Sequence, residues 1–187
     1  IENDIKAKDE KIISFKNLHI SNGWFDSSVS FGEPGFEERE TLENGLKTSS
    51  KSGFTDIILN PNTNPVIDSH SSVSHIYKKT NDSATNVHVL ASLTKESLGK
   101  EIAELYDMHI AGAVAFGDYK KTLNNSNILR IALDYVQSFD GIIMSYPFDF
   151  DLSKEGLMHE GSVSLKLGIK GIPEIAETSI LLRDIEI

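Results

Sequence analysis

The stretch DSSVSFGEPGFEERE, Asp26 to Glu40, joins the end of a short apolar run to a turn rich in glycine and proline and then to a charged segment typical of a helix. Strand alternation places Ser28 and Ser30 on one face and Val29 on the other. Two histidines at that spacing would chelate one metal ion, whereas a neutral hydroxyl is a weak ligand for zinc. The stretch therefore has the frame of a metal site with serines at the ligand positions.

Apolar runs alternate with helical patterns along the chain, which is typical of βα units and a parallel sheet. We expect strands at residues 19–31, 54–60, 86–93, 110–118 and 141–147, and helices at residues 37–51, 69–79, 95–105, 125–138 and 173–187. Five βα units fit either a doubly wound sheet or part of a (β/α)8 barrel. A full barrel typically needs about 250 residues. The chain of 187 residues would hold about the first five units.

The same pattern predicts two domain segments. Residues 1–20 alternate polar and apolar residues and carry few helix signals, so we expect them to be exposed antiparallel strand or loop, the end of a small N-terminal β-domain. Residues 21–187 are expected to be the (β/α) barrel portion, truncated at the C-terminus because the sequence stops inside a helical pattern.

Composition narrows the classes of function. The chain is 39% hydrophobic and 25% charged, the balance of a globular domain. Its formal net charge of -10 would repel a phosphate backbone or an anionic membrane, so we expect no nucleic-acid or membrane partner. The chain has no cysteine, which excludes disulfides and cysteine-bound metals. We expect a cytoplasmic protein, since no signal-peptide pattern and no long apolar run are found.

The ends of the other expected strands carry polar residues. The loop Asn60 to Pro65 reads NPNTNP, and its amides could bind a carboxylate or an imide, although turn chemistry also explains this composition. Asp118 comes after the fourth strand, where it could be a metal ligand, a general base or a turn residue. Ser145 stands at the end of the fifth strand, where an enzyme would place a histidine or an acid. The six histidines show no pair with metal-ligand spacing.

Several ordered motifs resemble the dihydroorotases of the amidohydrolase superfamily, whose relatives include allantoinases and dihydropyrimidinases. The family phrase Asp-x-His-x-His-x-Arg-Glu-Pro-Gly stands here as residues 26–35, DSSVSFGEPG. Residues 53–65 resemble the family's Gly-Phe-Thr strand and its Met-Pro-Asn-Thr-x-Pro loop. Residues 159–187 resemble its Glu-Gly-x-x-Ser-x-x-Leu-Gly-x-x-Gly-x-Pro-x-x-Ala-Glu segment. The resemblance runs from about Asn22 to the last residue and implies the metal-dependent barrel fold.

The resemblance implies hydrolysis or formation of a cyclic amide in pyrimidine biosynthesis, with one or two zinc ions that activate a water. This chain departs from that pattern. Ser28 and Ser30 replace both histidines after the first strand, and Ser145 replaces the histidine after the fifth. Gly32 replaces the arginine that would pair with the substrate carboxylate.

Two family positions survive. Asn62 matches a residue that contacts the substrate carboxylate, and Asp118 matches a metal-binding acid of some members. One carboxylate cannot hold a catalytic zinc, which needs three protein ligands. We therefore expect no cofactor, with vestigial metal positions at Ser28, Ser30, Asp118 and Ser145.

The sequence supports three hypotheses of function. The first is a catalytically impaired dihydroorotase-like protein that acts as a structural or regulatory partner of aspartate carbamoyltransferase or of an active paralogue, and that forms a homo-oligomer. The second is an active dihydroorotase or related cyclic amidase that hydrolyses dihydroorotate to carbamoyl aspartate, with Asp118 as base and Asn62 holding the substrate. The third is a sensor that binds dihydroorotate or carbamoyl aspartate without turnover.

Overall fold

The computed structural model describes residues 14–187 of the chain. Its strands are β1 (Trp24–Val29), β2 (Phe54–Leu59), β3 (Asn86–Ala91), β4 (Ala113–Phe116), β5 (Met158–His159) and β6 (Gly171–Ile172). Its α-helices are α1 (Leu42–Lys51), α2 (His70–Thr80), α3 (Leu105–Ile110), α4 (Ser126–Val136), α5 (Phe150–Ser153), α6 (Ser162–Leu167) and α7 (Ile175–Glu186). Two 3₁₀ turns are η1 (Lys95–Ser97) and η2 (Gln137–Phe139).

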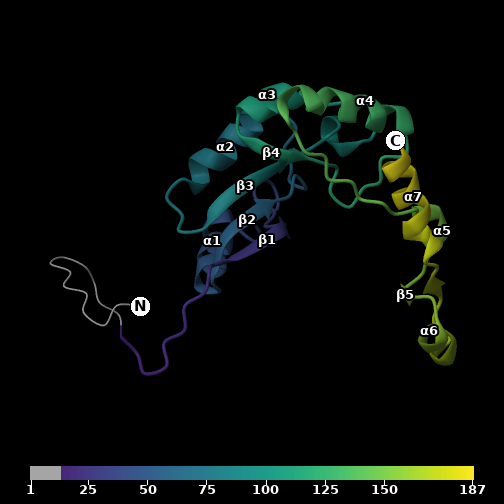
Figure 1. The fold of residues 1–187 in the computed structure, drawn as a ribbon, viewed down its shortest axis with the longest axis horizontal. Coiled ribbons are helices and arrows are strands. Elements are labelled where there is room, and N and C mark those ends of the chain that lie inside the picture. Colours follow the sequence, from purple (N-terminus) through teal and green to yellow (C-terminus); the bar gives the residue numbers. More distant parts are fainter. Residues whose placement is uncertain (1–13) are drawn as a thin grey trace.

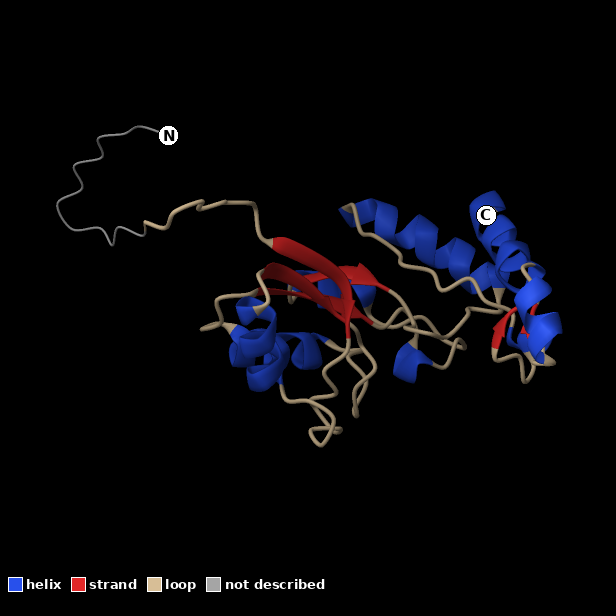
Figure 2. Cartoon of the chain, turned by 90° about the horizontal axis from the view of Figure 1, so that it is seen from below, coloured by secondary structure: helices blue, strands red, loops and turns tan. Residues whose placement is uncertain are grey.

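Strands β1 to β4 form one parallel sheet in the order β1-β2-β3-β4. Each strand leads into a helix before the chain returns to the next strand, and Figure 1 shows this series from α1 and β1 to α4. Figure 2 shows helices on one side of the red strands. The arrangement confirms the predicted fold class, an α/β chain that forms part of a (β/α)8 barrel.

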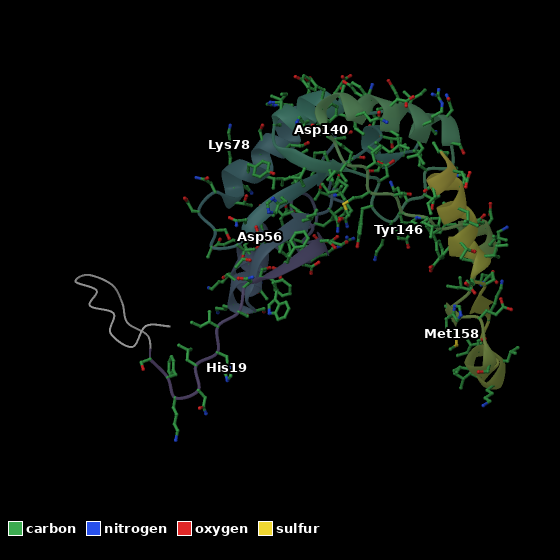
Figure 3. All side chains as sticks on the ribbon, in the orientation of Figure 1. His19, Asp56, Lys78, Asp140, Tyr146 and Met158 are labelled. Carbon is green, nitrogen blue, oxygen red and sulfur yellow. The ribbon has the colours of Figure 1, made fainter. Side chains whose placement is uncertain are left out.

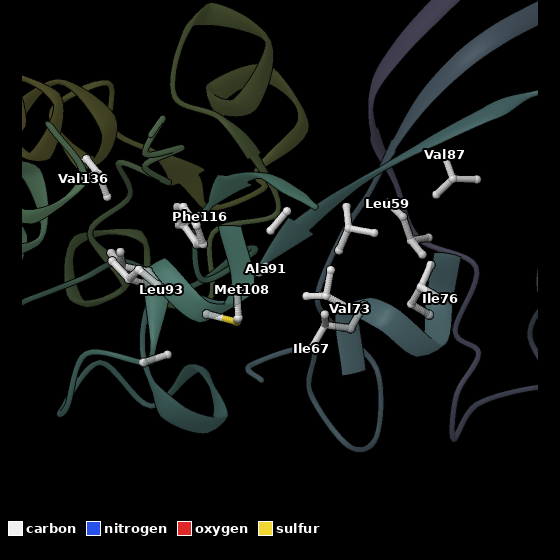
Figure 4. Packing of buried hydrophobic residues seen from close by; sticks show 14 of the residues in the cluster. Leu59, Ile67, Val73, Ile76, Val87, Ala91, Leu93, Met108, Phe116 and Val136 are labelled. Atoms are coloured by element: carbon white, nitrogen blue, oxygen red, sulfur yellow. The ribbon is translucent and has the colours of Figure 1, made fainter. Parts of the chain in front are cut away.

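The core lies between the sheet and its helices. In β2, Ile57 and Leu59 are buried while the residues between and before them are more exposed, as alternation in a strand requires. They pack in one cluster with Val89 of β3 and with Val73 and Ile76 of α2, and Figure 4 shows members of this cluster. Burial of these apolar side chains is what holds the helices on the sheet.

The opposite face of the sheet is open at β1. Phe25, which pairs with Asp56 of β2, is 58% exposed, and no helix within residues 14–187 covers this side of β1 in Figure 2. Asp56 of β2 lies over the strands, as Figure 3 shows, and its carboxylate is 3.0 Å from Nε2 of His88 in β3. In a closed barrel the inner face of the sheet is filled by layers of such inward-pointing side chains.

Two helix starts were predicted correctly because their caps are local. The Ser69 side chain accepts a hydrogen bond from the Ser72 N–H at the start of α2, and the two residues form a capping box. The Asn125 side chain accepts from the Asn127 and Ile128 N–H groups at the start of α4, within one residue of the expected start.

The prediction of a helix at residues 95–105 was wrong. Only η1 forms there, because Glu96 and Ser97 adopt positive φ values of 53° and 52°, which interrupt an α-helix. The chain then folds back, with an antiparallel bridge between Thr94 and Ile102. Helix α3 begins at Leu105, so the next strand, expected from residue 110, is limited to β4.

Other boundaries also differ. The helix expected from residue 37 begins at Leu42, because turns occupy the residues before it and Thr41 caps the helix. The strand expected at residues 19–31 is limited to β1. The strand expected at residues 141–147 is reduced to one parallel bridge from Ile143 to Phe116 of β4. Two backbone hydrogen bonds of 2.8 Å accompany that bridge, so the segment lies at the expected place in the strand order.

The C-terminal arm, residues 149–187, contains α5, the small parallel pair β5–β6, α6 and α7. Figures 1 and 3 show it extending beyond the end of the sheet, with Met158 near its far end. Side chains of α7 tie the arm to the rest of the chain: Arg183 donates to the Leu123 carbonyl over 2.8 Å, and Asp184 accepts from the Ser145 hydroxyl. Within the arm, Asp149 donates its N–H to the Ala176 carbonyl over 2.6 Å. The sequence did not predict the β5–β6 pair.

Residues 14–23 form turns and loop, with no strand among them. Residues 1–13 lie outside the described residues, so the small N-terminal β-domain expected at residues 1–20 stays a prediction, as does the boundary at residue 21. Among the helices of residues 14–187, none combines the length and apolar character that a membrane span needs.

We expect the Leu59→Ala variant to lower the free energy of unfolding by about 2 to 5 kcal/mol, because it leaves a cavity under α2. Leu59 is 0% exposed, and the matched control, Leu165→Ala in α6, removes a side chain that is 81% exposed. Urea denaturation monitored by circular dichroism measures both. Equal losses for the two variants would show that the cluster beneath the sheet is not the core.

Candidate functional site

Polar side chains gather where the parallel strands end. Ser28 and Ser30 lie at the end of β1, Asn60 comes directly after β2, and Asp118 comes two residues after β4. In barrels of this kind the loops at the carboxyl ends of the strands build the active site. The structure brings the first three of these residues together and places Asp118 in a separate set of contacts.

The serine–asparagine cluster consists of Ser28, Ser30, Asn60 and Asn62. The Asn60 side-chain amide donates from Nδ2 to the Ser28 hydroxyl over 3.1 Å and to the Ser30 hydroxyl over 3.2 Å. The Ser30 hydroxyl donates to Oδ1 of Asn62 over 2.9 Å. The two serines therefore contact the same amide, which confirms that they share a face.

Asn60 is the member that sequence reasoning missed. The sequence predicts that the amides of this loop bind a carboxylate or an imide or serve turn chemistry, yet Asn60 is 1% exposed and lies between the two strand ends. Its Oδ1 is a buried oxygen without a hydrogen-bond partner among the described residues. The available signal was the resemblance itself, because Asn60 stands where the family loop has methionine.

Gly32, where the resemblance implies an arginine, has a backbone conformation that suits glycine. Its φ is +111°, a conformation that residues with a Cβ rarely adopt, and an added Cβ would lie 2.7 Å from the Phe36 carbonyl oxygen. The turn is closed by a hydrogen bond of 2.9 Å from the Phe36 N–H to the Gly32 carbonyl. An arginine at this position would require the loop to move.

The Asp118 carboxylate is buried and surrounded by donors from the loop after β3. Its Oδ1 accepts from the Ser92 hydroxyl over 2.8 Å and from the Thr94 N–H over 3.0 Å, and its Oδ2 accepts from the Thr94 hydroxyl. Asp118 is 6% exposed. These contacts hold the loop after β3 against the end of β4. They correspond to the turn role, one of the three roles that the sequence allows for Asp118.

Ser145 does not join the serine–asparagine cluster. Its hydroxyl donates to Oδ2 of Asp184 in α7, and Asp184 also forms an ion pair with Arg183 at 2.6 Å. The residue at the family histidine position therefore anchors the C-terminal arm. Sequence reasoning had no signal for this contact, since Ser145 and Asp184 lie far apart in the chain.

These residues do not fit a zinc ion. The hydroxyls of Ser28 and Ser30 are neutral, which makes them weak zinc ligands, and each directs one lone pair at an N–H donor of Asn60. Both oxygens of the Asp118 carboxylate are engaged by Ser92 and Thr94. Within residues 14–187, no group of three histidine or acidic side chains has the geometry to hold a metal ion.

Glu33 of the Glu-Pro-Gly turn organises the same end of the sheet. Its Oε2 accepts the Leu42 N–H at the start of α1 over 2.7 Å, and its Oε1 pairs with the Lys79 ammonium of α2. Burial opposes ionisation of this carboxyl, but the contacts with Lys79 and Leu42 outweigh it and lower the Glu33 pKa. The turn therefore links β1 to both of the next two helices.

A model of the family described as "Dihydro-orotase-like" matches residues 19–187. The chain belongs to this family. A curated dihydroorotase from Syntrophus aciditrophicus (strain SB) is 38% identical over 95% of this chain and 42% of its own length. One from Pelotomaculum thermopropionicum (strain DSM 13744 / JCM 10971 / SI) is 42% identical over 87% of this chain and 38% of its own length. The resemblance drawn from the motifs is thereby confirmed.

The match is confined to part of each relative. The chain spans about two fifths of the length of the curated dihydroorotases that it matches. The barrel portion described above is thus a dihydroorotase-like barrel segment with a serine–asparagine cluster at the strand ends.

We expect Asp118→Asn to lower the free energy of unfolding by about 1.5 to 3 kcal/mol, because an amide group would face the donors of Ser92 and Thr94. The control is Asp134→Asn, which removes an exposed pair with Arg130 at 3.0 Å. That pair contributes about 0.3 to 0.5 kcal/mol. Urea denaturation compares the two variants. A loss at Asp118 no larger than the control would contradict the structural role.

Glu33→Gln tests the turn through the dependence of the free energy of unfolding on pH. A lowered pKa stabilises the fold above the unfolded pKa of about 4.3, and this stabilisation disappears as the pH falls through the folded pKa. We therefore expect the variant to be less stable than the parent by about 1 to 2 kcal/mol at pH 7, with a difference that shrinks below about pH 4. The exposed Glu38→Gln is the control. A difference independent of pH would exclude the ionised pair as its cause.

Proposed function

We propose that this chain is a dihydroorotase-like protein whose catalytic capacity is impaired and whose work is binding, as a structural or regulatory partner. One observation carries the proposal. The hydroxyls at the two expected ligand positions, Ser28 and Ser30, accept hydrogen bonds from the Asn60 amide, so that position holds neutral groups bound to one another.

Catalysis of cyclic-amide hydrolysis needs an activated water and stabilisation of the charge that develops on the carbonyl oxygen. Asp118 is the acid that could serve as base, and its oxygens accept hydrogen bonds from Ser92 and Thr94. Gly32 offers no guanidinium to a substrate carboxylate, and its positive φ disfavours any side chain there. These features support impairment more than an active dihydroorotase acting on dihydroorotate.

The partners we propose are aspartate carbamoyltransferase or an active paralogue, together with a second copy of this chain. This proposal is supported by apolar side chains that are exposed away from the sheet and its helices. In the C-terminal arm, Leu157 is 82% exposed, Leu165 is 81% exposed and Ile185 is 69% exposed. Exposed apolar side chains are the kind of surface that a protein partner buries.

The test is zinc content and dihydroorotate hydrolysis, with the Syntrophus aciditrophicus dihydroorotase assayed beside it. We expect substoichiometric zinc and a rate at least about a thousandfold below the control, because loss of a metal-activated nucleophile removes several kcal/mol of transition-state stabilisation. Stoichiometric zinc with turnover near the control would support the alternative, an active dihydroorotase.

The same preparation tests binding. Size-exclusion chromatography with light scattering is run on the chain alone and after mixing with aspartate carbamoyltransferase or the active relative. A mass above that of one chain supports the proposed assembly. A monomer that binds neither protein, together with calorimetric heat on titrating carbamoyl aspartate, would favour the sensor hypothesis instead.

A further inference from the structure

The Asn60 amide contacts both serines at the end of β1. It reaches them from the first residue after β2, over 3.1 Å and 3.2 Å, across 32 and 30 residues of sequence. Backbone pairing already joins the strands at Val29 and Leu59, next to these side chains. The amide therefore adds a side-chain bridge at the point where the two strands leave the sheet.

The bridge leaves one buried polar atom, the Oδ1 of Asn60, without a hydrogen-bond partner among the described residues. Asn60 itself is 1% exposed. Exchanging the amide oxygen and nitrogen does not remove the problem, because both serines contact the same end of the amide and the other end stays buried. A buried polar atom without a partner destabilises a fold. An apolar side chain would avoid this cost but could not bridge the hydroxyls.

The bridge also sets the electrostatics of the former ligand position. A cation bound there would need the lone pairs of Ser28 and Ser30. Those oxygens face the Nδ2 group of Asn60, which is the positive end of the amide dipole, and the Ser30 proton is donated to Asn62. A cation would therefore meet N–H groups where it needs free oxygens.

We propose that Asn60 is a cross-link that takes the place of a metal: it ties β1 to β2 through Ser28 and Ser30 and keeps cations out of that position. The inference rests on the proposed function, since it explains how the scaffold keeps the strand ends in order without a metal ion. It assigns to Asn60 a positioning role that neither the family resemblance nor the relatives' names contain.

A double-mutant cycle tests the cross-link. Asn60→Met removes the bridge with a side chain of similar length, and the S28A/S30A double variant removes its acceptors from exposed positions. We expect Asn60→Met to lower the midpoint of thermal unfolding by about 2 to 4 °C in the parent and by less than about 1 °C in S28A/S30A. Asn124→Met, at an exposed loop position, is the control and should not shift the midpoint. Equal shifts in both backgrounds would overturn the cross-link.

Zinc binding tests whether Asn60 keeps cations out of the position at Ser28 and Ser30. Zinc is titrated by calorimetry into S28H/S30H and into S28H/S30H/N60M. We expect the triple variant to bind zinc at least about tenfold more tightly, because the opposing N–H groups are gone. Equal affinities would overturn exclusion by Asn60. Stoichiometric zinc in the unmodified chain would instead overturn the proposed function, and the thermal cycle would still decide the cross-link.

Discussion

Parallel hydrogen bonding from β1 to β4 brings the carboxyl ends of all four strands to one edge of the sheet. Everything that could be a site depends on this constraint, because it places residues from distant parts of the sequence within contact distance. Ser28 and Asn60 are 32 residues apart in the chain and 3.1 Å apart in space. The helices buried on one face of the sheet hold that edge in place.

At the ends of β1 and β2 the polar side chains are neutral. Hydroxyls and amides bind one another in the serine–asparagine cluster, and the buried carboxylate of Asp118 holds the loop after β3. The Gly32 backbone close by has a φ of +111°, a conformation that suits glycine. Hydrogen bonds between neutral groups, and from donors to the Asp118 carboxylate, thus organise this part of the chain.

Local signals accounted for much of the fold. Strand β2 and helices α2 and α4 were predicted closely, because alternation and caps such as Ser69 and Asn125 act within a few residues. The helix expected at residues 95–105 failed because Glu96 and Ser97 adopt positive φ values, which their residue types do not announce. The residues of the candidate site show the same difference between local and distant signals. Ser28 and Ser30 were found from spacing, whereas Asn60 and Asp184 were missed because their contacts are distant in sequence.

The sequence by itself determined the parallel α/β class, the family resemblance and the presence of serines at positions 28, 30 and 145, since each depends on residue type and short-range order. Only the tertiary structure decided what those positions do instead. Ser145 could have joined the two serines, but it binds Asp184 of α7, and Asn60 occupies the space between Ser28 and Ser30. The physical reason is that a hydrogen bond is short and directional, so its partners depend on how the strand ends and α7 are placed in three dimensions.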